Sequence, residues 1–362
     1  MEENKKPKLR KRINQWMHKN RKILFIIGGI LLVCIAGIVT FLILSKKTTP
    51  TPEITPTRAV EKTVEVVKYY SPLTGVLVAN ETATKLPVTG IMIENSPDAR
   101  PQSGIKNSGI VFEAIAEGGI TRFLVLYQQE KPQLIGPVRS VRSYYIDWAA
   151  AFNASIAHVG GSSTALAEVR NGNYRDIDQF FNSSTYWRAT DRYAPHNVYT
   201  SFEKIDALNT AKGYTSSTFT GFTHTDGQAS EIASATSINI NMSSALYNSH
   251  YIYDKTTNTY ARSQAGEPHM DREAGQITPS VVIAMNVEES TITDDGHQNI
   301  ITIGSGKAVI FQNGTAINAT WSKKSKTDQI TFTDESGKNI PLVRGQTWIS
   351  AIPTKSGSVT WE

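Results

Sequence analysis

The run IVFEAIAEGGITRFLVLY, residues 110–127, decides the fold, because two strand-like segments flank Gly118-Gly119. A Gly-Gly turn supplies the positive φ angles that a tight hairpin needs, so residues 110–117 and 120–127 are predicted to pair. Alternation along the strands then puts Glu113, Glu117 and Arg122 on one face of the hairpin. The opposite face is predicted to belong to the core and carries Ile110, Phe112, Phe123, Val125 and Tyr127.

The segments around this hairpin mix strands and helices. An apolar run at 88–94 predicts a buried strand that ends in Glu94. Downstream, Pro137 suits the first turn of a helix predicted over 138–152. A strand at 154–159 and helices at 164–170 and 202–212 follow. We expect the polar side chains of this region to line the floor of a cleft.

The character of the sequence changes after residue 213. A Ser/Thr-rich stretch leads into runs typical of strands, and Asn313-Gly314 between two such runs is the strongest hairpin signal in the chain. The sequence therefore predicts an α/β (mixed α+β) N-terminal domain over residues 71–213, followed by a mostly β C-terminal domain over 214–362.

The first 70 residues predict a membrane anchor. Residues 23–44 carry no charge and match the thickness of the bilayer core, so they are predicted to form a single transmembrane helix. Residues 1–22 hold nine Lys or Arg and two acids, which predicts a cytoplasmic tail with the folded part outside. Residues 45–70 are rich in Pro and Thr and predict an extended linker. Cys34 and the residues before it have the outline of a lipid-attachment site, but Val33 stands where Gly or Ala is normally required.

Composition excludes some classes of function. Most of the excess positive charge lies in the tail, so the folded part is nearly neutral and carries no footprint for nucleic acid. Cys34 is the only cysteine, which excludes disulfides and thiol catalysis outside the membrane. Serine-hydrolase, zinc-protease and complete phosphate-loop motifs are absent, and no Cys or His spacing predicts a metal. We therefore predict no cofactor and no metal site.

Four groups of polar residues are candidates for chemistry. Glu113 and Glu117 around Arg122 suit a ligand cradle or an acid/base pair, or else a solvated ion-pair cluster. Arg139 and Arg142, three apart at a helix start, suit phosphate or carboxylate, unless they pair with Asp147, Glu94 or Glu113.

The third and fourth groups lie further along the chain. His158 ends a strand before Gly160-Gly161-Ser162-Ser163, a loop that suits an anion only weakly, and a packed histidine is the alternative. Arg192, His196 and Asn197 lie among aromatic residues, a mixture that suits a glycan or a protein interface.

Several long strings resemble one family. They are SPLTG (71–75), IMIENSPDARPQSG (91–104), VFEAIAEGGITRFL (111–124), IGPVRSVRSYYID (135–147), HVGGS (158–162), APHNVYTS (194–201), YIYDKTTNTYARSQAGEPHMD (251–271), FQNG (311–314) and GQTWIS (345–350). They are similar to the YerB-like lipoproteins, domain of unknown function 3048, over residues 71–362. The resemblance implies a bacterial surface protein with an α/β domain beside a β-rich one, and it implies no activity. The family's usual lipid anchor is replaced here by a hydrophobic span.

Two functional hypotheses follow. The first is a surface protein that binds an envelope glycan, a peptide or a protein partner through a cleft formed by Arg122, Arg139, Arg142, Arg192, His196 and Asn197. The alternative is an envelope hydrolase or transferase whose acid/base residues come from Glu94, Glu113, Glu117, His158 and His196. Whether these groups converge decides between a shared site and scattered, locally neutralised pairs.

Overall fold

A computed structural model describes residues 7–44, 67–292 and 296–362 of the chain. It divides into two units, Met1–Glu65 and Val66–Glu362. The first unit contains α1 (Pro7–Lys19) and α2 (Arg21–Leu44). Helix α2 is long and apolar enough to cross a membrane, a property that signal sequences near an N-terminus share. Most of the predicted linker, up to residue 66, lies outside the described residues.

The second unit, called here the C-terminal unit, is built on one mixed sheet of ten strands. In spatial order these are β22 (Thr331–Thr333), β21 (Thr315–Lys323), β20 (Gly304–Gln312), β17 (Val281–Val287), β24 (Thr347–Pro353), β4 (Ile110–Glu117), β5 (Ile120–Tyr127), β3 (Thr89–Glu94), β6 (Ser155–His158) and β7 (Arg175–Asp178). The parallel pair of β24 and β4 joins strands of the late sequence to strands of the early sequence. The sheet is therefore continuous across residue 213, and the predicted domain boundary there stays a prediction.

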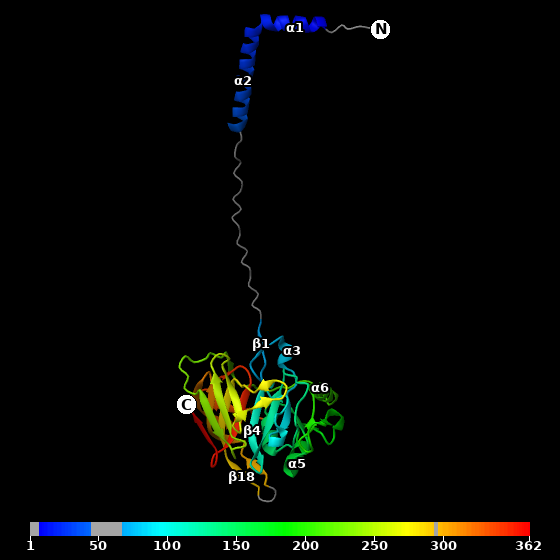
Figure 1. The fold of residues 1–362 in the computed structure, drawn as a ribbon, viewed down its shortest axis with the longest axis vertical. Coiled ribbons are helices and arrows are strands. Elements are labelled where there is room, and N and C mark those ends of the chain that lie inside the picture. The colour runs from blue at the N-terminus through cyan, green and yellow to red at the C-terminus, as the bar shows by residue number, and fades with distance from the viewer. Residues whose placement is uncertain (1–6, 45–66, 293–295) are drawn as a thin grey trace. The chain divides into compact units, whose positions relative to one another are not determined.

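Both faces of this sheet are covered (Figure 1). On one face lie α4 (Ser143–Ala150) and α5 (Ser163–Asn171), whose apolar side chains share a core with Phe112 and Leu124. The other face packs against α6 (Phe202–Ala211) and a five-stranded sheet, and its core contains Phe123 and Trp348. The strands of that second sheet are β14 (Glu267–Pro268), β13 (Thr259–Gln264), β12 (Ser249–Asp254), β11 (Ser237–Asn241) and β25 (Ser358–Trp361).

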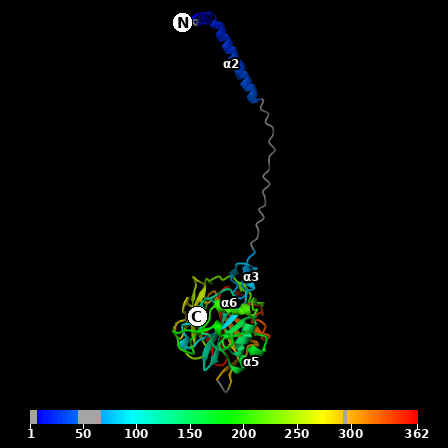
Figure 2. The same cartoon turned by 90° about the vertical axis from the view of Figure 1, so that its right-hand side faces the viewer.

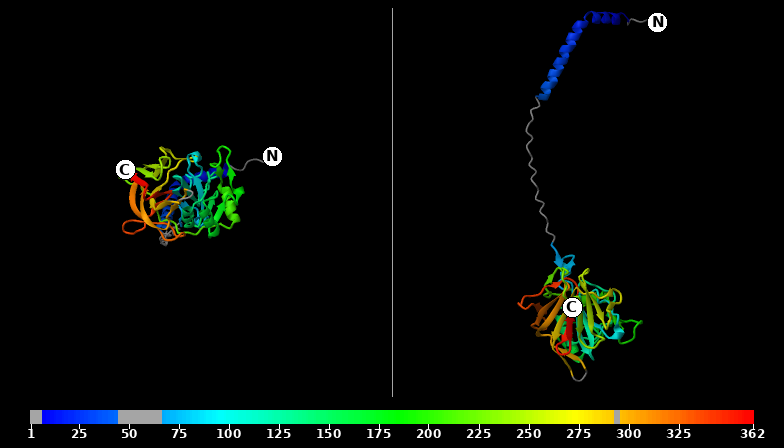
Figure 3. Two further views of the ribbon diagram at one scale, coloured as in Figure 1. Left: turned by 90° about the horizontal axis from the view of Figure 1, so that it is seen from below. Right: turned by 60° about the vertical axis from the view of Figure 1, so that its left-hand side comes forward.

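The two halves of the sequence differ as predicted. Helices α5 and α6 gather on the side of the unit that faces the viewer in Figure 2, and the strands of the late sequence come forward in the right-hand view of Figure 3. The mixed α/β character of the early part and the mostly β character of the late part are confirmed. The shorter elements are α3 (Glu81–Thr84), β1 (Tyr69–Tyr70), β2 (Leu77–Val78), β8 (Trp187–Arg188), β9 (Val198–Tyr199), β10 (His224–Thr225), β15 (Met270–Asp271), β16 (Gly275–Gln276), β18 (Glu289–Thr291), β19 (Gln298–Ile300) and β23 (Leu342–Val343).

The Gly118-Gly119 hairpin forms as predicted, but its side chains are distributed differently over its two faces. Glu117 pairs with Ile120, and a bulge between Ile115 and Glu117 then shifts the register, so that Ala114 faces Arg122. One extra residue in a strand moves every side chain beyond it to the other face. Glu113 therefore lies on the face of Phe123, opposite to Arg122, and the predicted grouping of Glu113 with Arg122 is wrong.

The helix predicted over 138–152 begins later, at Ser143. Residues 138–141 are extended because their backbone groups bond to neighbouring strands and loops: Arg139 N–H donates to Met92 O, and Val141 N–H donates to Gly160 O. Arg139 therefore precedes the helix, and Arg142 is its N-cap residue. The prediction that both arginines project from one helical turn is wrong.

Candidate functional site

The carboxyl ends of three parallel strands place the candidate site. Strands β3, β6 and β7 run parallel and end at Glu94, His158 and Asp178. Ligands of open α/β sheets bind outside this edge, because the loops that leave the strands converge there. The loop after β3 and the extended segment 138–141 both lie at this edge, since Ile93 bridges to Val138.

Glu94 lies at the centre of a cluster built from three separate segments. Ser96 Oγ donates a hydrogen bond to Glu94 Oε1 at 2.9 Å. His196 Nδ1 lies 2.9 Å from the same oxygen, and Arg139 Nε lies 3.6 Å from it. We call Glu94, Ser96, Arg139 and His196 the Glu94 cluster. Its members come from the end of β3, the extended segment before α4 and the loop before β9.

The second carboxylate oxygen of Glu94 is uncommitted. Its Oε2 is buried and has no hydrogen-bond partner among the described residues. The Glu94 side chain is only 5% exposed, whereas the side chains of Arg139 and His196 are 28% and 23% exposed. An unpaired buried acceptor costs free energy unless a donor reaches it. The cluster therefore offers one buried acceptor beneath two partly exposed cationic or hydrogen-bonding groups.

Arg192 and Asn197 hold the loop that carries His196. Arg192 Nη1 and Nη2 donate to the backbone oxygens of Asp98 and Pro101, at 3.0 and 2.6 Å. Asn197 Nδ2 donates to Ala189 O at 3.0 Å. These side chains were predicted as ligand contacts, but in this structure both bond to the protein's own backbone. They position His196 against Glu94.

Glu113 belongs to a different, fully buried network on the other face of the sheet. Its Oε2 accepts hydrogen bonds from Arg262 Nη2 and Trp348 Nε1, both at 2.9 Å. Both members of the ion pair are inaccessible to solvent. Arg262 also bonds to His269, whose pKa burial lowers far below its usual value, with Arg262 and Arg100 adding to the effect. This network joins the two sheets, and neither member of its ion pair contacts solvent.

Glu117 bridges two arginines on the α4 face. Its carboxylate accepts hydrogen bonds from Arg122 Nη2 and Arg142 Nη2, at 2.5 and 2.7 Å. Burial alone would raise the pKa of Glu117, but Arg122 and Arg142 outweigh burial and lower it below its ordinary value. Arg142 also contacts His297 at 3.0 Å. Glu117 and Arg122 therefore form an ion pair, as the alternative predicted, but the pair is not solvated, because the Arg122 side chain is only 2% exposed.

His158 is packed. The side chain is completely buried, with Nδ1 2.8 Å from Gly160 O and Nε2 3.0 Å from Asp176 Oδ1. The amide of Gly160 donates to Asp178 Oδ1, so the loop is occupied by the protein's own carboxylate. This arrangement matches the packed alternative, and the Gly160 amide is already bonded to Asp178 rather than free for an anion.

The structure thus unites part of the predicted site. Glu94, Arg139 and His196 meet, whereas Glu113, Glu117 with Arg122 and Arg142, and His158 lie in three other networks. Ser96 was missed, and its position two residues after the strand-ending Glu94 was the available signal. Within residues 7–44, 67–292 and 296–362, no three His, Cys, Asp or Glu side chains form a group that could hold a metal ion.

Comparisons with known proteins agree with this fold. Models of the protein family of unknown function DUF3048 match the chain, the N-terminal domain over residues 73–215 and the C-terminal domain over 238–349. The chain therefore belongs to the DUF3048 family, and the resemblance drawn from its sequence is confirmed.

One relative matches the chain in both sequence and structure. The chain is 32% identical over 291 residues to a protein named "Putative lipoprotein YerB" of Bacillus subtilis, covering 79% of this chain and 87% of that protein. A crystal structure of YerB from the same organism superposes with a TM-score of 0.73 at 30% identity, over 81% of this chain and all of the solved chain. This kinship and the apolar N-terminal helix indicate secretion or anchoring at the envelope, and neither names an activity.

Proposed function

We propose that this protein is a membrane-anchored binding protein of the bacterial envelope, and that its Glu94 cluster binds a peptide. The observation that carries this proposal is the buried, unpaired Glu94 Oε2 beside the partly exposed Arg139 and His196. Three segments far apart in the sequence are held in place to form this arrangement.

Anchoring rests on the composition of the N-terminus. Helix α2 has 24 residues, enough to span the bilayer core at 1.5 Å per residue. The basic residues before it favour a cytoplasmic N-terminus and a C-terminal unit outside. Cys34 lies in the middle of this apolar helix, and Val33 before it disfavours lipid attachment. We therefore propose a single-pass span rather than a lipid anchor.

The chemistry of the cluster favours a ligand that carries both a donor and a carboxylate. Glu94 Oε2 can accept a hydrogen bond from an amine or amide of the ligand. The only ion pair of the Arg139 guanidinium with a described residue is the 3.6 Å contact to Glu94, so its outer nitrogens are available to a carboxylate. Peptide stems of cell-wall fragments carry both groups. A neutral glycan lacks the carboxylate that Arg139 suits.

The geometry favours binding over nucleophilic catalysis. In a serine hydrolase the acid and the serine bond to opposite nitrogens of the imidazole. Here Glu94 Oε1 and Ser96 Oγ both lie at His196 Nδ1, at 2.9 and 3.2 Å, and Nε2 points toward Asp98, 3.9 Å away. His196 in this position does not accept the Ser96 proton on one nitrogen while Glu94 orients it through the other.

Calorimetric titration of the full-length protein in detergent with purified stem peptides that carry no sugar tests the proposal. Arg139→Gln is expected to weaken binding roughly tenfold or more, the effect of losing a charge-assisted hydrogen bond. Arg344→Gln is the matched control, because Arg344 is 25% exposed and paired with Asp226 outside the cluster. Equal affinities of the wild type and Arg139→Gln would contradict the proposal. Cleaved products that disappear in Glu94→Gln would replace it with the hydrolase hypothesis.

A further inference from the structure

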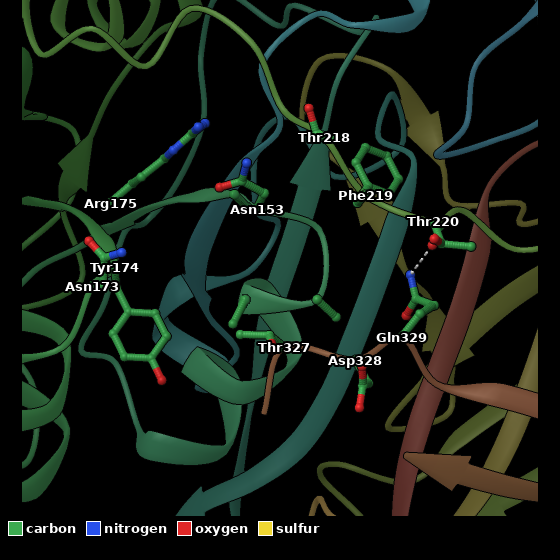
Figure 4. Close-up of a pocket in the computed structure, with 13 residues that line it drawn as sticks. Asn153, Asn173, Tyr174, Arg175, Thr218, Phe219, Thr220, Thr327, Asp328 and Gln329 are labelled. Atoms are coloured by element: carbon green, nitrogen blue, oxygen red, sulfur yellow. Dashed lines mark hydrogen bonds between the residues drawn. The ribbon is translucent and has the colours of Figure 1, made fainter. Parts of the chain in front are cut away.

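A hollow lies at the other end of the same parallel strands. It has a volume of about 530 Å³ and is formed by the turn after α4, the turn before β7, residues 218–220 and residues 327–329 (Figure 4). Asn153 precedes β6 and Arg175 begins β7, so this hollow and the Glu94 cluster lie at opposite ends of these strands. Its volume falls within the range typical of small-ligand sites.

The floor of the hollow is apolar and carries aromatic rings. Ala151 and Ala154 are buried beneath it. The Phe219 ring is fixed edge-on against Phe152, with 5.5 Å between the ring centroids. In Figure 4 the rings of Tyr174 and Phe219 lie on opposite sides of the hollow. Two rings held apart in this way offer flat faces to a ligand.

The rim carries uncommitted side-chain amides. The side chains of Asn153 and Asn173 make no hydrogen bond to any residue that the structure describes, and both line the hollow. Gln329 lies beside Thr220 at one side of the hollow and donates to Thr220 O at 3.3 Å (Figure 4). Each free amide can donate and accept, which suits neutral hydroxyl and acetamido groups.

The charged side chains that line the hollow do not favour the binding of a charged ligand. Arg175 and Asp328 are its charged residues, and they are of opposite sign. The Arg175 guanidinium is already committed, since it donates to Ser216 O at 2.8 Å and lies 5.3 Å from the Tyr214 ring centroid. A charged peptide would find no free guanidinium here, unlike at the Glu94 cluster.

One wall of the hollow is held in place from beneath. Lys323 is almost completely buried, and its ammonium group donates to the backbone oxygens of Lys326 and Asp328, at 2.7 and 2.5 Å. This contact fixes the loop that presents Asp328 and Gln329. A preformed wall lowers the entropic cost of binding.

We infer that this hollow is a second binding site, which takes a neutral, N-acetylated oligosaccharide. A sugar ring stacks on Tyr174, the acetamido methyl group packs on the alanine floor, and Asn153 and Asn173 bond to the acetamido and hydroxyl groups. This site is separate from the Glu94 cluster and does not depend on it.

Calorimetric titration of the full-length protein in detergent with tri-N-acetylchitotriose tests the inference. Saturable binding is expected, and Tyr174→Ala should weaken it about tenfold, as the loss of a stacking ring does. Asn173→Ala should weaken it less. Tyr193→Ala is the control, because Tyr193 is 91% exposed and is not among the lining residues. Arg139→Gln should leave this binding unchanged, which separates the result from the proposed peptide site.

Three results would overturn the inference. One is the absence of saturable heat at millimolar trisaccharide. Another is an unchanged affinity in Tyr174→Ala when its thermal unfolding matches that of the wild type. The third is equal affinity for cellotriose, which has the same ring faces without acetamido groups, because it would remove the role assigned to the alanine floor and the amides.

Discussion

Replacing Glu113 by glutamine is expected to destabilise the C-terminal unit by roughly 3–5 kcal/mol, the cost of leaving one member of a buried ion pair without its partner. The glutamine can still accept from Trp348 Nε1, and Thr121 can rotate to meet it, so shape and neutral hydrogen bonds are largely kept. What is lost is the negative charge 2.9 Å from Arg262 Nη2, where neither side chain contacts solvent.

The remaining surroundings of Arg262 offer only partial compensation. Its guanidinium lies 4.4 Å from the centroid of the Trp348 ring and donates to Tyr251 Oη and Gln264 Oε1, at 3.1 and 2.8 Å. These partners are neutral, so they cannot replace a carboxylate. The double variant Glu113→Gln with Arg262→Met removes both charges and is expected to recover part of the lost stability.

Urea unfolding of residues 66–362, followed by tryptophan fluorescence, measures this effect. The midpoint should fall with little change in slope, since the surface exposed on unfolding is unchanged. Glu81→Gln is the control, because Glu81 forms an exposed pair with Lys85 and should have no measurable effect. If Glu113→Gln unfolded within about 1 kcal/mol of the wild type, as exposed pairs do, the structural role of the pair would be refuted.

Three further outcomes are expected. Burial raises the pKa of Glu289 to about 7, so the stability tied to its neutral form is present at pH 4 and lost as pH rises through 7. In thermal scans Glu289→Gln should therefore unfold at a higher temperature than the wild type at pH 8, and at the same temperature as the wild type at pH 4. Glu117 has a lowered pKa, so its contribution is present above pH 4.5 and lost as pH falls further. Glu117→Gln should lower stability at pH 7 and flatten the acid limb of the stability profile, and an unchanged limb would contradict the role of its two arginines. Cys34→Ser should leave membrane fractionation unchanged, whereas release into the soluble fraction would favour a lipid anchor.

The sequence supplied much of the local structure. Gly118-Gly119 and Asn313-Gly314 each join two paired strands, because glycine and asparagine adopt the positive φ that such turns require. Helices predicted at 164–170 and 202–212 are α5 and α6, and each is preceded by a serine, Ser162 or Ser201, whose side chain caps the first turn. These features depend on residues close together in the chain.

The candidate site was only partly predictable. Glu94 at a strand end and His196 in a polar loop were both identified, but nothing in their spacing of 102 residues shows that they lie 2.9 Å apart. The grouping of Glu113 with Arg122 failed because a single bulge reversed the side-chain alternation. Arg139 was predicted in a helix but lies in an extended segment. The backbone there is extended because it bonds to Met92 and Gly160, and the local sequence does not reveal these distant partners.

The sequence by itself determined the apolar N-terminal helix, the change from mixed to β structure, the tight turns and the family. These properties are set by composition and by neighbours within a few residues. Only the tertiary structure decided which carboxylates are neutralised and which oxygen stays unpaired, since it places Arg262 on Glu113 and leaves Glu94 Oε2 without a described partner. The physical reason is that charge pairing and burial act through space, between segments that the ten-stranded sheet brings together from both halves of the chain.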